Sequence, residues 1–198
     1  MKKVPVAELN RKIIHLGSVF IPISYIWYVK EQKTMILILI CLFTISIIID
    51  FLRIKLSILN NFFKYFFSKM LRESEIDGKF TGATWLLLGS LLTIMFFPIY
   101  IAVPALIYLT IGDSFAALVG KAFPYGRVGA KSITGTLTGI ILSSIVALYL
   151  NEVLPFGLII LGSIVAMIIE LLPHRALNDN LTIPLLSAFS IQIFFQFL

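Results

Sequence analysis

Long apolar runs separated by short polar stretches fill most of the chain. Each of seven runs approaches the roughly 20 residues that an α-helix needs to cross a bilayer. They lie near residues 13–29, 34–52, 82–97, 99–120, 134–150, 155–172 and 181–198. The pattern predicts an all-α, polytopic membrane helix bundle of about seven transmembrane helices. We expect the first run to be a retained helix, because it is long, contains Pro22 and lacks a small-x-small cleavage pattern.

The stretch between the second and third runs has a different pattern. Its apolar residues recur at i, i+3, i+4, i+7, i+8 and i+11, and its basic residues fall on the other flank. The apolar set is Leu59, Phe62, Phe63, Phe66, Phe67 and Met70, and the basic set is Lys64, Lys69 and Arg72. This spacing predicts a cytoplasmic amphipathic helix that either lies in the membrane interface or packs on the bundle.

The composition agrees with a membrane protein. Hydrophobic residues make up 59% of the 198 residues and charged residues only 13%, and the mean hydropathy is +1.01. A water-soluble domain would carry about twice that charged fraction. We therefore expect one multi-pass integral membrane domain over residues 1–198, in contact with a phospholipid bilayer. The single cysteine, Cys41, leaves no disulfide framework and no cysteine-based metal site.

Basic residues fall almost entirely on one side of the predicted membrane. With seven spans, the N-terminus and the segments 53–81, 121–133 and 173–180 share a side and hold 14 of the 16 Lys and Arg residues. The other side holds Lys30 and Lys33. Because positive loops stay in the cytoplasm, we expect the N-terminus inside and the C-terminus outside, in the plasma membrane if the source is a prokaryote. This placement also explains the net charge of +6 without a nucleic-acid partner.

Carboxylates gather on the same side. Asp50, Asp113 and Glu170 lie near the predicted cytoplasmic ends of the second, fourth and sixth spans. Asp179 follows in the loop before the seventh span. An ionised side chain within a bilayer costs about 3 kcal/mol or more, so it faces a partner, a cavity or a ligand. No acidic residue occurs in the outer half of a predicted span, which favours a site open to the cytosol over a channel or proton path.

These carboxylates, with nearby cations and glycines, suit a nucleotide–metal complex. Carboxylate oxygens hold Mg²⁺ together with phosphates and water, Lys and Arg neutralise phosphates, and glycine lets the backbone approach them. The segment 126–139 lies where the fifth span begins, and a helix N-terminus attracts anions. Its candidate ligands are Arg127, Lys131, Ser132, Gly135 and Thr136.

Several candidates also have a purely structural explanation. Asp113 can be the partner of a nearby Lys, Ser or Arg, and Asp179 can cap the seventh helix. Glu170 and Arg175 can form an interfacial ion pair. His15, one turn inside the first span, is either a satisfied interfacial residue or a base or phosphate contact.

Two further sets of residues favour structural roles. Asp50 is placed to pair with Arg53 one turn later. Gly82, Gly89, Gly135 and Gly139 can serve close helix packing, and for Gly89 this is the interpretation we prefer.

The order of these blocks resembles a known membrane family. The matching segments are ELNRKIIHLG, GKFTGATWLLLGSLLTIMFFP, GDSFAALVGKAF, KSITGTLTG and ELLPHRALNDNLTIPL. They resemble the CTP-dependent lipid-alcohol kinases, which include dolichol kinase, phytol and farnesol kinases and a yeast-type diacylglycerol kinase. That family is distantly similar to the CDP-diacylglycerol synthases.

The resemblance implies a division of roles among the candidates. The Gly-Asp motif and the later Asp-Asn motif, thought to bind metal and nucleotide in such families, map onto Asp113 and onto Asp179 with Asn180. The Lys-Ser-x-x-Gly-Thr element maps onto residues 131–136, with Lys131, Ser132, Gly135 and Thr136 as its ligands.

We therefore expect Mg²⁺- or Mn²⁺-dependent transfer of the γ-phosphoryl group of CTP to the hydroxyl of a polyprenol-like lipid alcohol at the cytoplasmic face. The expected metal ligands are Asp113, Asp179 and Glu170, and the expected phosphate or nucleotide ligands are Lys121, Arg127, Lys131, Ser132, Gly135, Thr136, Arg175 and Asn180. A carboxylate or His15 would take the alcohol proton.

Two rival functions stay open from the sequence. A cytidylyltransferase would join CTP to a lipid phosphate with much the same metals and lysines. A small transporter or lipid-binding membrane protein would bind without turnover. The sequence also leaves open CTP against ATP, the identity of the lipid, the number of metals and the oligomeric state, with a homodimer among the permitted assemblies.

Overall fold

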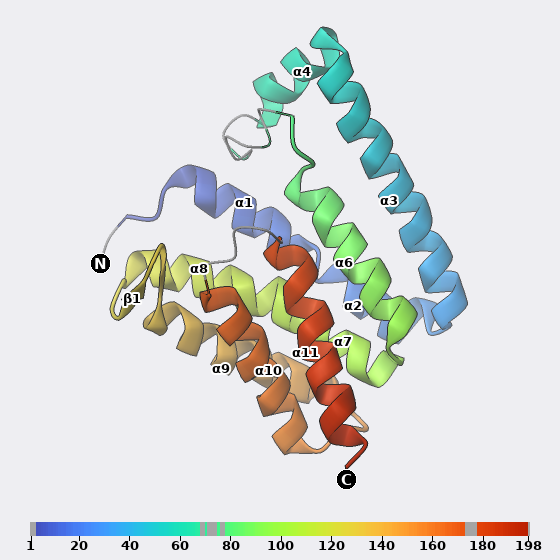
Figure 1. The fold of residues 1–198 in the computed structure, drawn as a ribbon, viewed down its shortest axis with the longest axis vertical. Helices are drawn as coiled ribbons and strands as arrows, with labels where there is room; N and C mark the ends of the chain where they lie inside the picture. The colour runs from blue at the N-terminus through green and yellow to red at the C-terminus, as the bar shows by residue number, and fades with distance from the viewer. Residues whose placement is uncertain (1–2, 68–69, 71–74, 76–77, 173–177, 198) are drawn as a thin grey trace.

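The computed structural model describes residues 3–67, 70, 75, 78–172 and 178–197, and in this part of the chain the protein is helical apart from one short hairpin (Figure 1). The elements are α1 (Val6–Gly17), α2 (Phe20–Ser24), the π-helix η1 (Tyr25–Val29), α3 (Gln32–Lys55), α4 (Ser57–Phe67), α6 (Gly82–Phe96), α7 (Ile99–Ile107), the π-helix η2 (Tyr108–Gly112), α8 (Asp113–Ala122), β1 (Arg127–Val128), β2 (Lys131–Ser132), α9 (Ile133–Leu150), α10 (Phe156–Leu171) and α11 (Asp179–Phe195). The antiparallel hairpin pairs Arg127 with Ser132 and Val128 with Lys131.

Helix occupies each of the seven apolar ranges that the sequence predicts. Four helical segments are long and apolar enough to cross a membrane, namely Val6–Val29, Gln32–Lys55, Ile99–Ala122 and Ile133–Leu150. Three apolar helices are shorter, namely Gly82–Phe96, Phe156–Leu171 and Asp179–Phe195. The all-α class is therefore confirmed, and several helices are suited to a membrane.

One continuous helical segment, α7–η2–α8, forms the centre of the bundle. In its most apolar window 78% of the residues are buried, against 17% for α3. It contacts α9, α10 and α11, and α11 in turn lies beside α6 (Figure 1). Because this segment carries Asp113 at the start of α8, the predicted site residue sits on the most enclosed helix of the protein.

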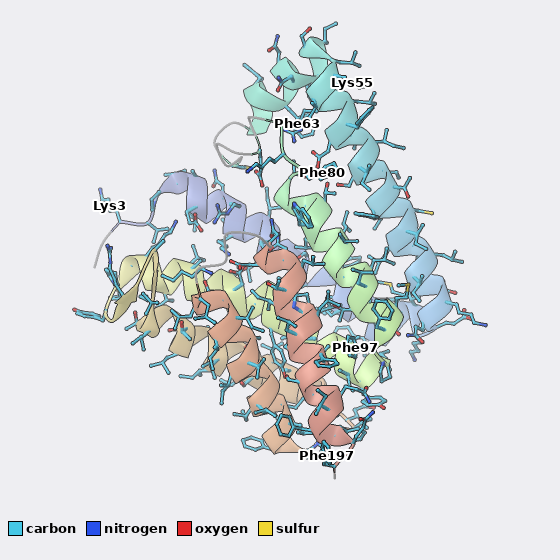
Figure 2. All side chains as sticks on the ribbon, in the orientation of Figure 1. Lys3, Lys55, Phe63, Phe80, Phe97 and Phe197 are labelled. Atoms are coloured by element: carbon cyan, nitrogen blue, oxygen red, sulfur yellow. The ribbon has the colours of Figure 1, made fainter. Side chains whose placement is uncertain are left out.

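Helix α3 lies at the edge of the bundle and exposes a long apolar face (Figure 2). Leu37, Ile45 and Ile48 are between 50% and 63% exposed, although α3 packs against α6 and, near its ends, against η1 and α4. A water-soluble monomer rarely exposes a continuous apolar surface of this extent. The exposed face therefore supports association with a membrane.

Prolines shape the helices next to the site. Pro22 has no N–H to donate to the carbonyl of Ser18, four residues earlier, and its ring clashes with a regular helix there. The chain accordingly turns between α1 and α2, and the Ser18 carbonyl accepts from the Ile21 N–H instead, at 2.9 Å. Pro104 lies inside α7, one turn before the π-helical residues Tyr108–Gly112. π-Helical turns occur frequently at functional sites.

The predicted amphipathic stretch begins as a helix, α4. Among its described side chains, Phe62 is exposed and the ring of Phe63 lies 5.7 Å from the guanidinium carbon of Arg53. The helix thus packs on the end of α3, with Phe63 beside Arg53, while Phe62 is exposed. Whether it lies in the membrane interface stays a prediction.

Candidate functional site

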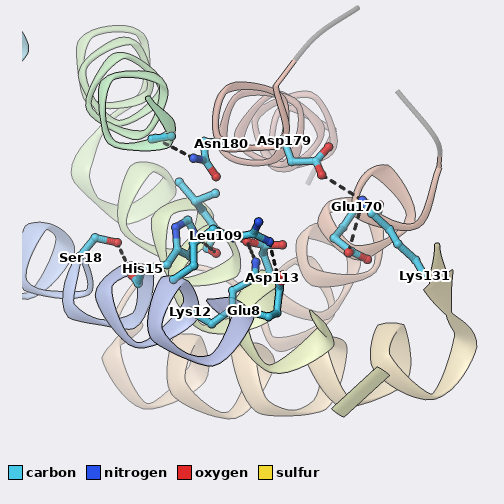
Figure 3. A network of polar contacts seen from close by, with 12 residues as sticks. Glu8, Lys12, His15, Ser18, Leu109, Asp113, Lys131, Glu170, Asp179 and Asn180 are labelled. Carbon is cyan, nitrogen blue, oxygen red and sulfur yellow. Dashed lines mark hydrogen bonds and ion pairs between the residues drawn. The ribbon is translucent and has the colours of Figure 1, made fainter. Parts of the chain in front are cut away.

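Asp113 is buried and ion-paired to the first helix of the chain. Its Oδ2 atom lies 2.5 Å from Nζ of Lys12 and 3.2 Å from Nε2 of His15, both on α1 (Figure 3). Lys12 is also buried, so the two opposite charges compensate each other where water has little access. The sequence leaves open whether Asp113 pairs with a nearby Lys, Ser or Arg. The structure shows that it pairs with a lysine, Lys12.

The hydrogen bonds of His15 determine its protonation pattern. Nε2 of the ring also lies 3.1 Å from the carbonyl oxygen of Leu109, in the π-helix η2. Because a carbonyl oxygen only accepts, we assign the hydrogen to Nε2, which donates to Leu109, while the nearby Asp113 carboxylate is an electrostatic contact. In the neutral imidazole, Nδ1 is then the nitrogen that can accept a proton.

A cavity of about 490 Å³ joins these residues to the start of α11. Its polar lining includes Lys12, His15, Asp113, Asp179 and Asn180. Its apolar lining includes Ile14, Ile21, Ile49, Leu86 and Leu87. The structure therefore brings together four residues that the sequence singles out, one from α1, one from α8 and two from α11. A cavity lined by both charged and apolar side chains suits an amphiphilic ligand.

Asn180 is held in the cavity wall by helix α6. Its Nδ2 donates to the carbonyl oxygen of Gly82 at 2.8 Å. Its own carbonyl has no N–H partner four residues later, because that residue is Pro184. The Asn180 carbonyl lies against Gly89, where an added Cβ would overlap its oxygen. The packing role that we prefer for Gly89 is confirmed.

Lys131 neutralises two further carboxylates beside the cavity. Its Nζ lies 2.9 Å from Oδ2 of Asp179 and 3.3 Å from Oε1 of Glu170, and it donates to the Glu170 carbonyl (Figure 3). Burial alone lowers the pKa of Lys131, but the negative charges of Glu170, Asp179 and, more weakly, Asp113 outweigh burial and raise this pKa above its ordinary value. Lys131 is therefore a fixed cation that ties β2 to α10 and α11.

The other residues of the Lys-Ser-x-x-Gly-Thr element serve the local structure. The Ser132 hydroxyl caps α9 by accepting from the Gly135 N–H at 3.3 Å, and the Thr136 hydroxyl donates to the Ser132 carbonyl at 3.2 Å. Gly135 lies against α8, where an added Cβ would overlap the carbonyl oxygen of Ala116. The start of α9 is thus partly capped by the side chain of Ser132. Gly135 has the role in close helix packing that the sequence allows.

The remaining candidate cations lie away from the cavity or outside the described residues. Nζ of Lys121 lies 2.7 Å from Oε2 of Glu8, which also pairs with Arg11 at 2.6 Å. Arg127 is exposed on the hairpin. Arg175 falls outside the residues that the structure describes.

The cavity contains carboxylates, which are suitable ligands for Mg²⁺. In this structure Lys12 and Lys131 form ion pairs with them. Carboxylate oxygens are the ligands that Mg²⁺ prefers, usually one or two per ion with phosphates and water. Asp113 and Asp179 line the cavity, whereas Glu170 is absent from its described lining. Among the described residues, three or more His, Cys, Asp or Glu side chains nowhere gather as a ready metal cage. Asp113 and Asp179 thus have the chemistry of Mg²⁺ ligands, and the binding of an ion by them or by Glu170 stays a prediction.

The sequence predictions include His15 but not its neighbours Glu8 and Lys12 on α1. Glu8, Lys12 and His15 recur at i, i+4 and i+7, which places them on one helical face. Glu8 and Lys12 are buried, so this face is a polar contact surface rather than a solvated one. The helical spacing was the signal that could have identified them, but the charges were assigned to membrane topology alone.

A second buried polar network lies at the opposite wall of the cavity. Oδ1 of Asp50 pairs with Arg53 at 3.2 Å, which confirms the predicted pair. Oδ2 of Asp50 accepts from the Thr81 N–H at 2.8 Å and from the Thr84 hydroxyl at 2.7 Å. Arg53 donates to the carbonyl of Glu75 at 2.7 Å. The network fixes the end of α3 to the start of α6.

Comparison with known proteins adds one relative. No family model and no solved structure matches the chain. The chain is 31% identical over 194 residues to "Uncharacterized protein RP860" of Rickettsia prowazekii (strain Madrid E), and the match covers 94% of each chain. The protein therefore belongs to the same family as this Rickettsia protein.

Proposed function

We propose that the protein transfers the γ-phosphoryl group of a nucleoside triphosphate to the hydroxyl of a membrane lipid alcohol. CTP as donor and a polyprenol-like acceptor follow from the resemblance to the lipid-alcohol kinases. The observation that carries the proposal is the buried carboxylate of Asp113, which faces a cavity with Asp179 and Asn180 on its polar side and apolar residues along its wall. Phosphoryl transfer needs positioning and charge compensation rather than a covalent intermediate.

In this proposal Asp113 and Asp179 hold Mg²⁺ or Mn²⁺. The ion, when bound, compensates the charge of the phosphate oxygens during transfer. Lys12 and Lys131 now neutralise these carboxylates at 2.5 and 2.9 Å. Binding of a metal–nucleotide complex would release both ammonium groups to the phosphates, where lysine acts as a compact point charge.

His15 is the proposed general base. The alcohol oxygen forms a bond to the γ-phosphorus as the bond from that phosphorus to the β–γ bridging oxygen breaks, and the nucleoside diphosphate leaves. The alcohol proton passes to Nδ1 of His15, because Nε2 already donates to the Leu109 carbonyl. The Asp113 carboxylate orients the ring and stabilises the imidazolium that forms.

The proposed topology places this chemistry at the cytoplasmic boundary. Seven spans with the N-terminus inside would put the start of α1, the start of α11 and the end of α3 on the cytoplasmic side. All three contribute to the cavity, through Lys12, Asp179 and Asp50. A lipid would reach the cavity sideways from the bilayer, and the nucleotide would reach it from the cytosol.

A cytidylyltransferase is the second candidate, and one observation favours it. Arg11 and Lys12 line the same cavity, and these two cations would suit an acceptor that carries a phosphate instead of a hydroxyl. In that reaction the acceptor phosphate attacks the α-phosphorus of CTP and releases pyrophosphate.

Position-specific labelling separates the two reactions. The purified protein is incubated in detergent with Mg²⁺ and CTP labelled at either the α- or the γ-phosphate, with polyprenols, polyprenyl phosphates or phosphatidate. Transfer of the γ-label alone into a polyprenol supports the kinase. Transfer of the α-label into a lipid phosphate supports the cytidylyltransferase, and transfer of neither label to any lipid contradicts both.

A further inference from the structure

A second cavity, of about 420 Å³, lies between α2–η1 and the first half of α3. Its described lining is almost wholly apolar and includes Phe20, Tyr28, Met35, Leu39 and Leu42. Charged residues are absent from this described lining, in contrast to the cavity at Asp113. The second cavity therefore suits hydrocarbon and not a polar head group.

The two cavities lie end to end along the same pair of helical segments. The first is bounded by residues 11–21 on one side and 46–50 on α3, whereas the second is bounded by residues 20–29 and by residues 35–42. As the lining residues run forward from 11–21 to 20–29, those on α3 run backward from 46–50 to 35–42, so we take the two cavities to follow one another between these segments. Ile21 contributes to the lining of both.

The line changes from charged to apolar along its length. The Asp113 end carries Lys12 and His15, and the far end is bordered by Tyr28, which is 76% exposed. About 20 Å of helix separates His15 from Tyr28, at a rise of 1.5 Å per residue. A groove of this length with charge at one end has the shape of an extended single-chain amphiphile.

The geometry points to one continuous groove for the hydrocarbon chain of the lipid acceptor. The hydroxyl lies at Asp113 and His15, the chain passes Ile21, and its far end lies between η1 and α3 beside Tyr28 and Leu39. Ile21 is a specificity-determining residue, since its side chain sets the width where the two cavities join. The identity of the head group rests on the proposed function, whereas the route of the chain rests on the cavities alone.

A chain-length series tests the role of Ile21. Geraniol, farnesol and geranylgeraniol, which grow by one isoprene unit at a time, are assayed as acceptors with the wild type, Ile21→Trp and Ile45→Trp. Ile45 is exposed on α3 and lines neither cavity. We expect Ile21→Trp to lower kcat/KM for geranylgeraniol at least about tenfold relative to geraniol, and Ile45→Trp to keep the wild-type ratio. An unchanged ratio in Ile21→Trp would overturn the inference while the kinase activity stands.

Photo-crosslinking tests the route without turnover. A geranylgeraniol analogue with a diazirine at its far end is irradiated with the protein in the absence of nucleotide, and labelled peptides are identified by mass spectrometry. Label in residues 20–42 of the wild type and of Ile45→Trp, lost in Ile21→Trp, supports the groove even if no phosphoryl transfer is found. Label confined to other helices overturns it. Ile21→Ala widens the junction and should keep the label. This variant controls for a folding defect, because it adds no bulk at the same position.

Discussion

Nζ of Lys12 lies 2.5 Å from Oδ2 of Asp113, although 101 positions separate the two residues in the sequence. Both side chains are buried. The ion pair therefore ties the first helix to the central helix at the point where the cavity is most polar. It also explains why a carboxylate is tolerated on a helix that is otherwise enclosed by apolar residues.

Removal of one partner of this pair should be costly. Lys12→Met leaves the Asp113 charge buried without its closest cation, and loss of one partner of a buried pair costs about 3–5 kcal/mol. We expect a clear fall in the thermal unfolding midpoint in detergent, and partial recovery in Lys12→Met/Asp113→Leu, which removes both charges. Lys121→Met is the matched control, because its ion pair to Glu8 is more exposed and such pairs contribute little. Equal effects of Lys12→Met and Lys121→Met would contradict the assignment.

His15→Gln separates the role of base from the role of hydrogen-bond donor. The glutamine amide can still donate toward Leu109 and Asp113 but cannot take a proton. General-base catalysis contributes about 10²–10⁴ in rate, so we expect kcat to fall by that factor with little change in the unfolding midpoint. The measurement is kcat across pH for both proteins, in which the variant should lose the acidic limb of the wild-type profile. A variant with wild-type kcat would show that another group takes the proton.

Gly89→Ala tests the contact that positions Asn180. A methyl group here would push the start of α11 away from α6, and overpacking costs about 1–3 kcal/mol. We expect a lower unfolding midpoint together with reduced activity, since Asn180 and Asp179 would both move. Gly157→Ala on α10 is the control, because nothing lies within 4 Å of a Cβ added at Gly157. If both alanine variants behave like the wild type, Asn180 does not depend on this contact.

The orientation in the membrane can be measured by cysteine accessibility. In a Cys41→Ser background, a membrane-impermeant maleimide should label Lys30→Cys on intact cells or sealed right-side-out vesicles. Arg127→Cys should react only after permeabilisation, because the proposed topology places it in the cytoplasm. The reverse pattern would move the cavity to the outer face and remove its access to cytosolic nucleotide.

The sequence predicted the helical segments, but the predicted start of the first span lies several residues after the observed start of the helix. The first span was expected from residue 13, whereas helix begins at Val6. Hydropathy ends a span at a charge, but Glu8 and Lys12 are buried because Lys121 and Asp113 neutralise them. Such pairing between distant residues leaves no trace in a local hydropathy pattern.

The candidate site was predicted in part. The intramembrane position of Asp113 identified it from the sequence, and the cavity joins it to His15, Asp179 and Asn180. Ser132 and Gly135 were expected to bind phosphate, which stays a prediction; the structure adds that Ser132 caps α9 and that Gly135 packs closely against α8. A short glycine-containing motif is compatible with both uses, and only the neighbouring backbone distinguishes them.

The most direct test of the account is transfer of γ-labelled phosphate from CTP to a polyprenol by the wild type and by Asp113→Asn, measured side by side in detergent with Mg²⁺. Gly157→Ala, at a position with open space around it and absent from the described lining of the cavity, serves as a folded control. The account predicts label in the lipid for the wild type and the control, and a loss of at least about a hundredfold in Asp113→Asn, since the variant removes a proposed metal ligand and the group that orients His15. Equal transfer by Asp113→Asn, with a normal unfolding midpoint, would contradict the central role of Asp113.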